Sequence, residues 1–570
     1  MGKQDGQQNA FYAAPGANDY FLRPRTGHGY SPREIAVCAQ DDGAWLSWIH
    51  RRNGEEYPVV VWKQPGAKRQ GRLARLDAGS GLFSKPVFSG NGAETPELFC
   101  AARGARGWEI RGYSVIGGRW QLYETLPTCC TAVYHMDAIT APDGRTLVFY
   151  AGITEARRGV SLFSRTRSKG KWRAERAHPM RGGSVNRPKL AIDSSGRVML
   201  GVDAYRESRF CVYTKPVDAG AQAWTRVCAE DGRQLFPSLI ADAGGALWIS
   251  WLCQTPVRRD DVMGLNHEAR VARLVRGKWR LVRDAGSPRI ADLNLGLLPV
   301  KRYFGYDGLR RYPRLLAAAD GAVRLLWEQQ RDETECWGNL ANGYLCARRQ
   351  GRGAWSKPAI LLDGGNAFTF DSRRLCKADS ALIVAKSEHS RNGDDWRVVN
   401  VQFADALPYR ARPRSLWQGW KPCPLPAQPK NAERVTLATK RAGKLKLFWG
   451  DLHCHSAFSP DAEGEVDELY FFARDLAAID FVCVADNDFY PEKTLLDSEA
   501  HYTAHLAGSL TMRDRFLALS GYEWTFHRPD KERSFNHRIV VFPGEERRIV
   551  RRNESLGRSE KAFCKYLRQT

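Results

Sequence analysis

Between residues 34 and 403, short apolar runs alternate with turn signals, and hardly any segment shows helical periodicity. The recurring phrase is an apolar strand, a tight turn that begins with Asp, and a second apolar strand. Asp-Gly turns favour hairpins, because glycine tolerates the positive φ angle that a tight turn requires. These turns begin at Asp42, Asp143, Asp193, Asp242, Asp320 and Asp379. The pattern therefore predicts a series of antiparallel hairpins along most of the chain.

A second recurring feature closes each unit, as a small residue or turn, then an aromatic residue, then a strand. The closing aromatic residues are Phe83, Trp120, Trp172, Trp224, Trp279, Trp355 and Trp396. Closures at a spacing of roughly 50 residues are typical of the four-stranded blades of a β-propeller. The cadence resembles that of sialidase-like propellers, but the chain lacks their full Asp-box, so a sialidase activity is not carried over. We predict an all-β propeller of seven blades, with six as the alternative.

The recurring tryptophans allow two interpretations. They could form a surface on which sugars or bases stack, or they could pack between blades. A residue that recurs once in every blade usually serves packing, and we predict that role here.

The pattern changes after residue 403. Prolines become frequent, together with Lys and Arg, at Pro408, Pro413, Pro422, Pro424, Pro426 and Pro429. Proline breaks regular elements, so we interpret residues 404–446 as a linker or a connector that wraps around the propeller.

From residue 447 to residue 570, apolar strands alternate with helical segments. We expect strands at 445–454, 481–484, 516–519 and 539–542, and helices at 466–478 and 559–567. Such alternation predicts a parallel sheet or barrel, in which functional groups collect at the carboxyl ends of the strands. The predicted organisation is an N-terminal extension (1–33), a propeller (34–403), the linker (404–446) and an α/β domain (447–570).

Composition adds a basic surface to this outline. The chain has 570 residues, 43% of them hydrophobic, and 86 Lys and Arg against 63 Asp and Glu, which gives a formal net charge of +23. A basic surface attracts anionic partners. The basic residues are scattered as short pairs and no recognition motif accompanies them, so we do not expect nucleic-acid binding. No segment has the length and apolarity of a membrane-spanning helix, and no signal peptide is visible. We expect a soluble protein that stays in the cytoplasm, unless a leader is missing from this sequence.

Candidate metal ligands gather in the α/β domain. His453 and His455 lie two positions apart on a strand, so their imidazoles point to the same side. Further acids and imidazoles follow at or near strand ends, namely Asp461, Asp486, Asp488, Glu523 and His537. Carboxylate and imidazole are the ligands that zinc, manganese and iron take in proteins. The cluster therefore predicts a site for divalent metal ions.

These residues resemble the polymerase and histidinol phosphatase (PHP) superfamily. The matching pieces are Gly450-Asp451-Leu452-His453-Cys454-His455-Ser456 with Asp461, residues 481–488, Gly521-Tyr522-Glu523-Trp524-Thr525 and Asn536-His537-Arg538. The resemblance implies a distorted TIM-type barrel in which His453 and His455 bind a first ion and His537 binds a second. It also implies that Glu523 bridges the two ions, that Asp461 lies near a third, and that Asp486 belongs to the catalytic group. The implied reaction is metal-dependent hydrolysis of a phosphorylated or otherwise anionic small molecule or polymer.

Two departures from the family pattern weigh against full activity. Family members carry Thr-Asp-His at the end of the second strand, and this chain has Ala485-Asp486-Asn487, which puts the third metal ion in doubt. The later ligands of the family are absent from this sequence, so we expect a truncated barrel. His501, His505 and His527 could replace missing ligands, but we predict that they are exposed loop or helix residues.

Three functions follow from these observations. The first is a metal-dependent phosphoesterase that carries a propeller for substrate or partner binding. The second is a non-catalytic propeller that binds a glycan or a protein and carries an inactive PHP remnant. Nucleic-acid binding ranks last.

Overall fold

The computed structural model describes residues 35–52, 54–67, 71, 73–77, 81–90, 96–220, 222–259, 262–282, 311–330, 343–350, 354–387, 396–408, 421–422, 436–439, 443–459, 462, 464–488, 495–527, 535–542, 548–552, 554–557 and 559–569. The predicted ligand Asp461 and the predicted N-terminal extension lie outside these residues.

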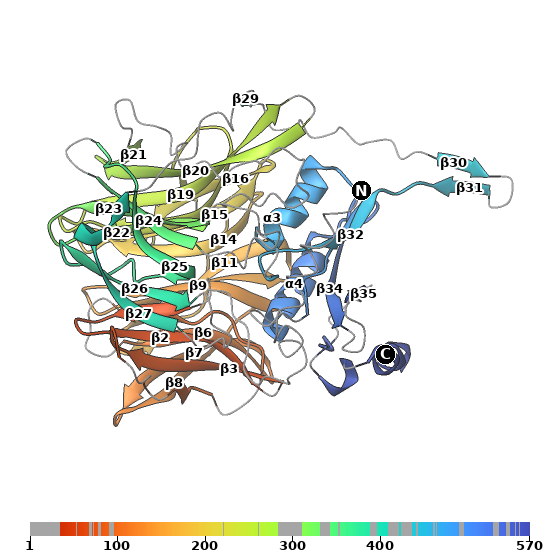
Figure 1. Ribbon diagram of the computed structural model, residues 1–570, viewed down its shortest axis with the longest axis horizontal. Coiled ribbons are helices and arrows are strands. Elements are labelled where there is room, and N and C mark those ends of the chain that lie inside the picture. The colour runs from red at the N-terminus through yellow and green to blue at the C-terminus, as the bar shows by residue number, and fades with distance from the viewer. Residues whose placement is uncertain are drawn as a thin grey trace, which may run out of the picture.

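Five antiparallel sheets follow one another along the first half of the chain (Figure 1). The first two contain β1 (Ala36–Ala39), β2 (Ala44–Arg52), β3 (Glu55–Lys63) and β4 (Ala74–Arg75), then β5 (Val87–Phe88), β6 (Leu98–Gly104), β7 (Gly107–Ile116) and β8 (Arg119–Pro127). The third contains β9 (Ala132–Thr140), β10 (Thr146–Thr154), β11 (Arg157–Ser168), β12 (Lys171–Trp172) and β13 (Arg176–Ala177). The fourth and fifth contain β14 (Ser184–Ile192), β15 (Val198–Arg206), β16 (Arg209–Pro216) and β17 (Thr225–Arg226), then β18 (Arg233–Ala241), β19 (Leu247–Arg259), β20 (Val262–Val275) and β21 (Lys278–Leu281).

The sixth and seventh blades share one strand. The sixth contains β22 (Arg311–Ala317), β23 (Val323–Gln330), β24 (Gly343–Gln350) and the first part of β25 (Ala359–Thr369). The second part of β25 pairs with β26 (Ser380–Ser387), which pairs with β27 (Trp396–Gln402). The chain therefore forms the predicted seven-bladed propeller.

Apolar clusters join each blade to the next and close the ring. Trp251 of β19 packs with Met199 and Val212 of the fourth blade. Trp396 of β27, in the seventh blade, shares a cluster with Leu46 of β2, in the first. Burial of this kind contributes about 25 cal/mol per Å² of apolar surface, so the stacked blade faces are the main source of stability.

The recurring aromatic residues pack between blades, as predicted. Trp172 of the third blade contacts Phe99 of the second, with 5.9 Å between ring centroids. Trp120 of the second blade contacts Trp45 of the first at 5.5 Å. The remaining closing tryptophans also belong to, or pack against, clusters between blades.

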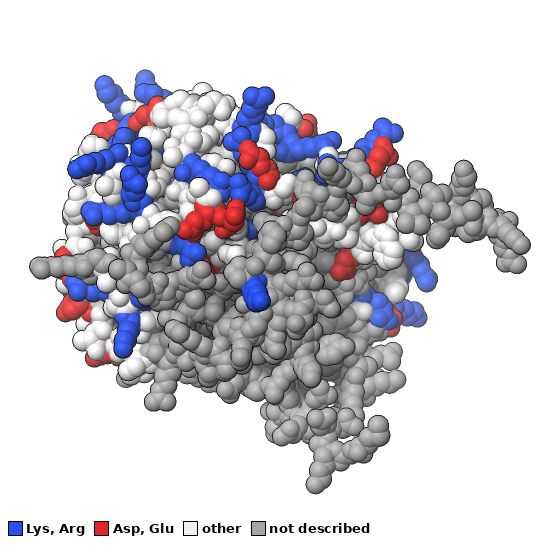
Figure 2. Space-filling view, turned by 90° about the horizontal axis from the view of Figure 1, so that it is seen from above, with Lys and Arg blue, Asp and Glu red and all other residues white. Residues whose placement is uncertain are grey.

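Parts of the predicted linker are strands that attach to blades. After a short helical turn, η3 (Phe403–Asp405), β28 (Leu407–Pro408) pairs with β25 and β29 (Lys421–Pro422) pairs with β19. A hairpin of β30 (Thr436–Thr439) and β31 (Gly443–Lys446) follows. On the face shown in Figure 2, the described Lys and Arg side chains lie among Asp and Glu and form no continuous patch.

The C-terminal segment forms a four-stranded sheet. Its order is β32 (Gly450–Cys454), β33 (Phe481–Val484), β34 (Leu517–His527) and β35 (Phe535–Phe542). The helices are α3 (Val466–Phe471), which continues as the π-helical turn η5 (Phe472–Leu476), then α4 (Asp497–Leu510), and finally η6 (Ser555–Gly557) and α5 (Glu560–Gln569).

Three expectations for this segment need correction. β34 and β35 pair antiparallel, whereas a parallel arrangement was predicted. The predicted apolar strand at 445–454 is divided into the end of β31 and a short, largely exposed β32. Among the described residues the sheet is open, with β32 and β35 at its edges, so the barrel that the family resemblance implies is not formed there.

The helices α3 and α4 lie between the C-terminal sheet and the propeller (Figure 1). One apolar cluster runs through this junction, and it joins Tyr134 and Tyr205 of the propeller to Phe471 and Tyr502. The rings of Tyr205 and Phe471 are stacked at 3.8 Å. This shared core holds the C-terminal segment firmly on one end of the propeller.

Buried polar contacts add to this junction. Arg187 of the fourth blade forms a bidentate pair with Asp467 of α3, at 2.9 and 3.1 Å. Arg233 of the fifth blade pairs with Glu468 at 3.1 Å. In the described part of the chain, no helix is long and apolar enough to cross a membrane.

Candidate metal centre

The metal-ligand candidates converge at the carboxyl ends of neighbouring parallel strands. His453 lies near the end of β32 and His455 directly after it, while Glu523 comes from β34. β33 lies between these two strands and ends at Val484. Beyond that point the side chains from β32 and β34 can approach each other directly. Among the described residues, His453, His455 and Glu523 form the one group whose ligand atoms all lie within 4.8 Å of one another.

The distances between the three ligand atoms match those between three ligands of a tetrahedral metal ion. The Nε2 atoms of His453 and His455 are 3.1 Å apart. Glu523 Oε2 lies 3.0 Å from His455 Nε2 and 3.4 Å from His453 Nε2. Ligand atoms about 2.0–2.1 Å from a tetrahedral ion are separated by about 3.3 Å, so a zinc-sized ion fits this set. His453 is 51% exposed, which leaves a further coordination position open to solvent.

Glu523 is held as a carboxylate. Burial alone would raise its pKa, but hydrogen bonds and charge from His455 and His537 bring the pKa well below its usual range. Oε2 faces His453 and His455, whereas Oε1 contacts Nδ1 of His537 on β35. A carboxylate with one oxygen on each side can bridge two ions.

Asn487 contacts the other nitrogen of His455. Its Nδ2 atom lies 3.2 Å from His455 Nδ1 and also donates to Ser459 Oγ. Its Oδ1 atom accepts from the Thr525 hydroxyl. The residue that departs from the family pattern is therefore the one that orients this imidazole.

The two aspartates after β33 have different surroundings. Asp486 accepts hydrogen bonds from the amide and hydroxyl of Ser456, at 2.6 and 2.8 Å, and so fixes the turn after His455. Asp488 accepts amide hydrogens from Thr525 and Arg552, and burial raises its pKa to about 6. The catalytic assignment of Asp486 stays a prediction.

The prediction for His501 was wrong. This residue of α4 is 1% exposed and accepts the Trp108 indole hydrogen at 3.2 Å, at the junction with the propeller. The ring of His505 lies beside it at 4.2 Å. The side chain of His527 is outside the described residues. Nothing in the sequence indicated that His501 lies at this junction, because its partner Trp108 is 393 positions away.

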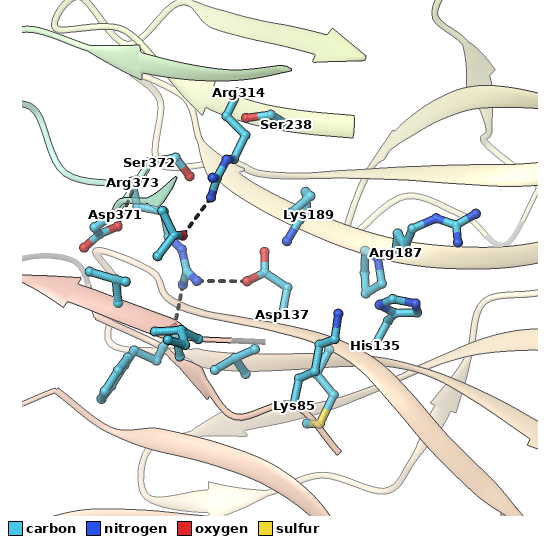
Figure 3. A pocket seen from close by; sticks show the side chains of 18 of the residues that line it. Lys85, His135, Asp137, Arg187, Lys189, Ser238, Arg314, Asp371, Ser372 and Arg373 are labelled. Atoms are coloured by element: carbon cyan, nitrogen blue, oxygen red, sulfur yellow. Dashed lines mark hydrogen bonds and ion pairs between the residues drawn. The ribbon is translucent and has the colours of Figure 1, made fainter. Parts of the chain in front are cut away.

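A second site, which the sequence did not reveal, lies in the propeller channel. Seven blades line a cavity of about 220 Å³ there (Figure 3). Its charged side chains are Lys85, Asp137, Arg187, Lys189, Arg314, Asp371, Arg373 and Glu465. Each comes from the first strand of a blade or a segment next to it, except Glu465, which precedes α3. These residues come from different blades and are far apart in the sequence, so no local pattern identifies them as a group.

No protein-family model matches the chain, and no curated protein matches it. Several solved structures are similar to it. An ulvan lyase, described as a new family of polysaccharide lyase and bound to an oligosaccharide, is 12% identical, covers 68% of this chain and 99% of its own, and has a TM-score of 0.44. An α-L-arabinofuranosidase from Fusarium graminearum is 12% identical over 52% of this chain and 89% of its own, with a TM-score of 0.36. An α-L-arabinanase from Penicillium chrysogenum is 13% identical over 54% and 90%, with a TM-score of 0.35.

Proposed function

We propose that the C-terminal segment is the metal centre of a hydrolase and that the propeller supports it and binds a ligand. The observation that carries the proposal is the set of three ligand atoms separated by 3.0, 3.1 and 3.4 Å. Two imidazoles, one carboxylate and an open position are the arrangement of catalytic zinc sites. The resemblance to the PHP superfamily supports a phosphoester, or another anionic compound, as substrate.

The chemistry follows from the ligand set. His453, His455 and Glu523 would hold one divalent ion of zinc, manganese or iron, and His537 with the second Glu523 oxygen would hold another. Such ions supply a hydroxide at neutral pH and neutralise charge on the phosphoryl oxygens. Glu523 is already ionised and the His455 ring already faces it, so beyond a change of the His455 tautomer these ligands need little rearrangement.

Metal content tests the site itself. We expect the purified protein to bind divalent metal, and His453→Ala to lose at least about 90% of it, because a first ligand is removed. His505→Ala is the matched control, since it removes a histidine that is not a ligand in the cluster. Equal metal in all three proteins, measured by mass spectrometry after dialysis, would refute the assignment.

Catalysis needs a separate assay. We expect Mn²⁺-stimulated cleavage of bis(p-nitrophenyl) phosphate by the wild type, and a loss of about 100-fold or more in His453→Ala. Metal binding without cleavage of this or any phosphomonoester would reject the phosphoesterase and keep the metal site.

A second candidate function rests on the propeller alone. The cavity of about 220 Å³ lies in the propeller channel, not at the metal cluster, and all seven blades line it. On this hypothesis the propeller binds a glycan or a protein, and the C-terminal segment is inactive. Glycan-array binding that persists unchanged in His453→Ala, together with no hydrolysis, would favour it.

A further inference from the structure

The propeller channel contains an ammonium group with no polar partner of its own. Lys189 lies on β14, the first strand of the fourth blade, and its side chain is exposed within the channel (Figure 3). No hydrogen bond or ion pair joins it to another side chain in the described part of the protein. Water can solvate this exposed ammonium, and an anionic oxygen in the channel would replace that water with a charge-assisted hydrogen bond.

The three arginines of the channel differ from Lys189 in this respect. Arg373 pairs with Asp137 at 2.9 Å and donates to the Phe88 carbonyl at 2.7 Å. Arg187 turns away from the cavity and pairs with Asp203 at 2.7 Å and with Asp467. Arg314 donates to the hydroxyl of Thr369 at 2.8 Å and to the carbonyl of Phe368 at 2.6 Å.

The balance of charge favours a single negative charge in the cavity. The lining holds five cations, Lys85, Arg187, Lys189, Arg314 and Arg373, against Asp137, Asp371 and Glu465, and Asp203 and Asp467 pair with Arg187 from behind the lining. These five positive and five negative charges balance when all are ionised, and protonation of Asp203 leaves an excess of one positive charge. Burial also raises the pKa of Asp203 to about 7, which lowers the negative charge behind Arg187. A doubly charged phosphate would meet repulsion from Asp371 and Glu465.

The electrostatics of Lys189 agree with this balance. Burial is the main factor that lowers its pKa; the Asp137 and Asp203 carboxylates oppose the change, and the charges of Arg373 and Arg314 add to it. Arg373 and Arg314 disfavour its ammonium form, and an anion placed between these cations and Lys189 would favour that form.

We propose that the propeller channel is a binding site for a small monocarboxylate, with the Lys189 ammonium as its main contact. The cavity has room for a compact organic acid, and Phe236 and Phe370 give it apolar walls. This site is independent of the metal centre, which uses other residues on the C-terminal sheet.

Titration calorimetry in chloride buffer tests the proposal with acetate, lactate and glucuronate, and with glucose as the neutral counterpart of glucuronate. We expect at least one carboxylate to bind the wild type, and Lys189→Met to bind it at least about tenfold more weakly, as for loss of a charged hydrogen bond. Lys189→Arg should retain part of the affinity. Lys171→Met, which removes an exposed lysine of β12, should bind like the wild type.

Metal content and melting temperature of each variant complete the experiment. Unchanged values in Lys189→Met show that weaker binding arises in the channel and not from unfolding or loss of the metal centre. Binding of none of the three carboxylates to the wild type, equal binding by Lys189→Met, or equal binding of glucose and glucuronate would overturn the proposal.

Discussion

The contact between Asn487 and His455 decides which imidazole nitrogen is available to a metal ion. With Nδ2 of Asn487 donating to Nδ1, the neutral ring carries its proton on Nε2, the atom that lies 3.0 Å from Glu523 Oε2. An ion at Nε2 requires that proton on Nδ1 instead. The amide must therefore turn its oxygen towards His455 when an ion binds, and the Ser459 hydroxyl must then donate to that oxygen instead of accepting from the amide.

We expect Asn487→Asp to tighten metal binding by about tenfold, because a carboxylate accepts the Nδ1 proton and fixes the required tautomer. The hydroxyls of Ser459 and Thr525 can both donate to the new oxygen atoms. Competition with a chelating dye measures the affinity. Asn400→Asp adds the same charge at an exposed position on β27 and should have no effect. Weaker binding by Asn487→Asp would show that the amide is the better partner.

At the scale of elements, the blade turns show how closely neighbouring hairpins approach. Gly196 and Gly245 both have positive φ angles, 77° and 74°, in the turns that join the first two strands of the fourth and fifth blades. A Cβ atom at Gly196 would meet nothing within 4 Å, whereas one at Gly245 would lie 2.5–2.6 Å from Ser194, partly against its backbone. The two turns also share a hydrogen bond from the Ser194 amide to the Gly245 carbonyl.

These glycines form a matched pair. Gly196→Ala should cost about 1 kcal/mol, the price of a left-handed backbone for a residue with a Cβ atom. Gly245→Ala should cost at least about 2 kcal/mol, since steric overlap adds to the same strain. Urea midpoints followed by tryptophan fluorescence measure both. Equal destabilisation by the two substitutions would mean that the Gly245 turn can move away from Ser194 without a loss of stability.

A buried ion pair helps to position the helix α3. Arg187 and Asp467 are both almost fully buried, so removal of the Asp467 charge leaves Arg187 with Asp203 as its remaining carboxylate and breaks its bidentate contact with α3. Asp467→Asn should destabilise the junction by about 3 kcal/mol. Asp218→Asn breaks the exposed pair with Arg145 and should cost less than about 1 kcal/mol. Urea midpoints and trypsin cleavage between the propeller and α3 distinguish the two variants.

At the scale of the whole molecule, the repeated blade elements could be predicted from the sequence, whereas contacts between residues far apart in the chain could not. The propeller was predictable because Asp turns and closing aromatics recur in every blade. The His453–His455 pair was predictable because alternation on a strand fixes its direction. Arg187 and Asp467 lie 280 positions apart, and no local pattern joins them. The antiparallel direction of β35 was missed for a similar reason. The hydrophobic pattern of a strand is the same in either direction, and its direction depends on the connection to the preceding strand.

The junction between propeller and C-terminal segment should weaken as the pH rises towards 7. Glu56 of β3 is 2% exposed and accepts hydrogen bonds from the amide and hydroxyl of Ser498, at the start of α4. Burial and the Asp497 carboxylate raise the pKa of Glu56 to about 7. An unfolded glutamate titrates near 4.3, so between about pH 4 and 7 folding takes up a proton. The stabilisation is complete below this window and is lost as the pH rises through it.

Asp203, with its pKa also raised to about 7 by burial, acts in the same direction beneath the Arg187–Asp467 pair. We therefore expect the melting temperature to be higher at pH 5.5 than at pH 8, and Glu56→Gln to reduce the difference by about 1–2 kcal/mol in unfolding free energy. Asp203 remains in that variant, so part of the difference should persist. Glu155→Gln, at an exposed turn, should leave the profile unchanged. A wild type that is equally stable at both pH values would mean that Arg51, 3.7 Å from Glu56, keeps this carboxylate ionised in the folded protein.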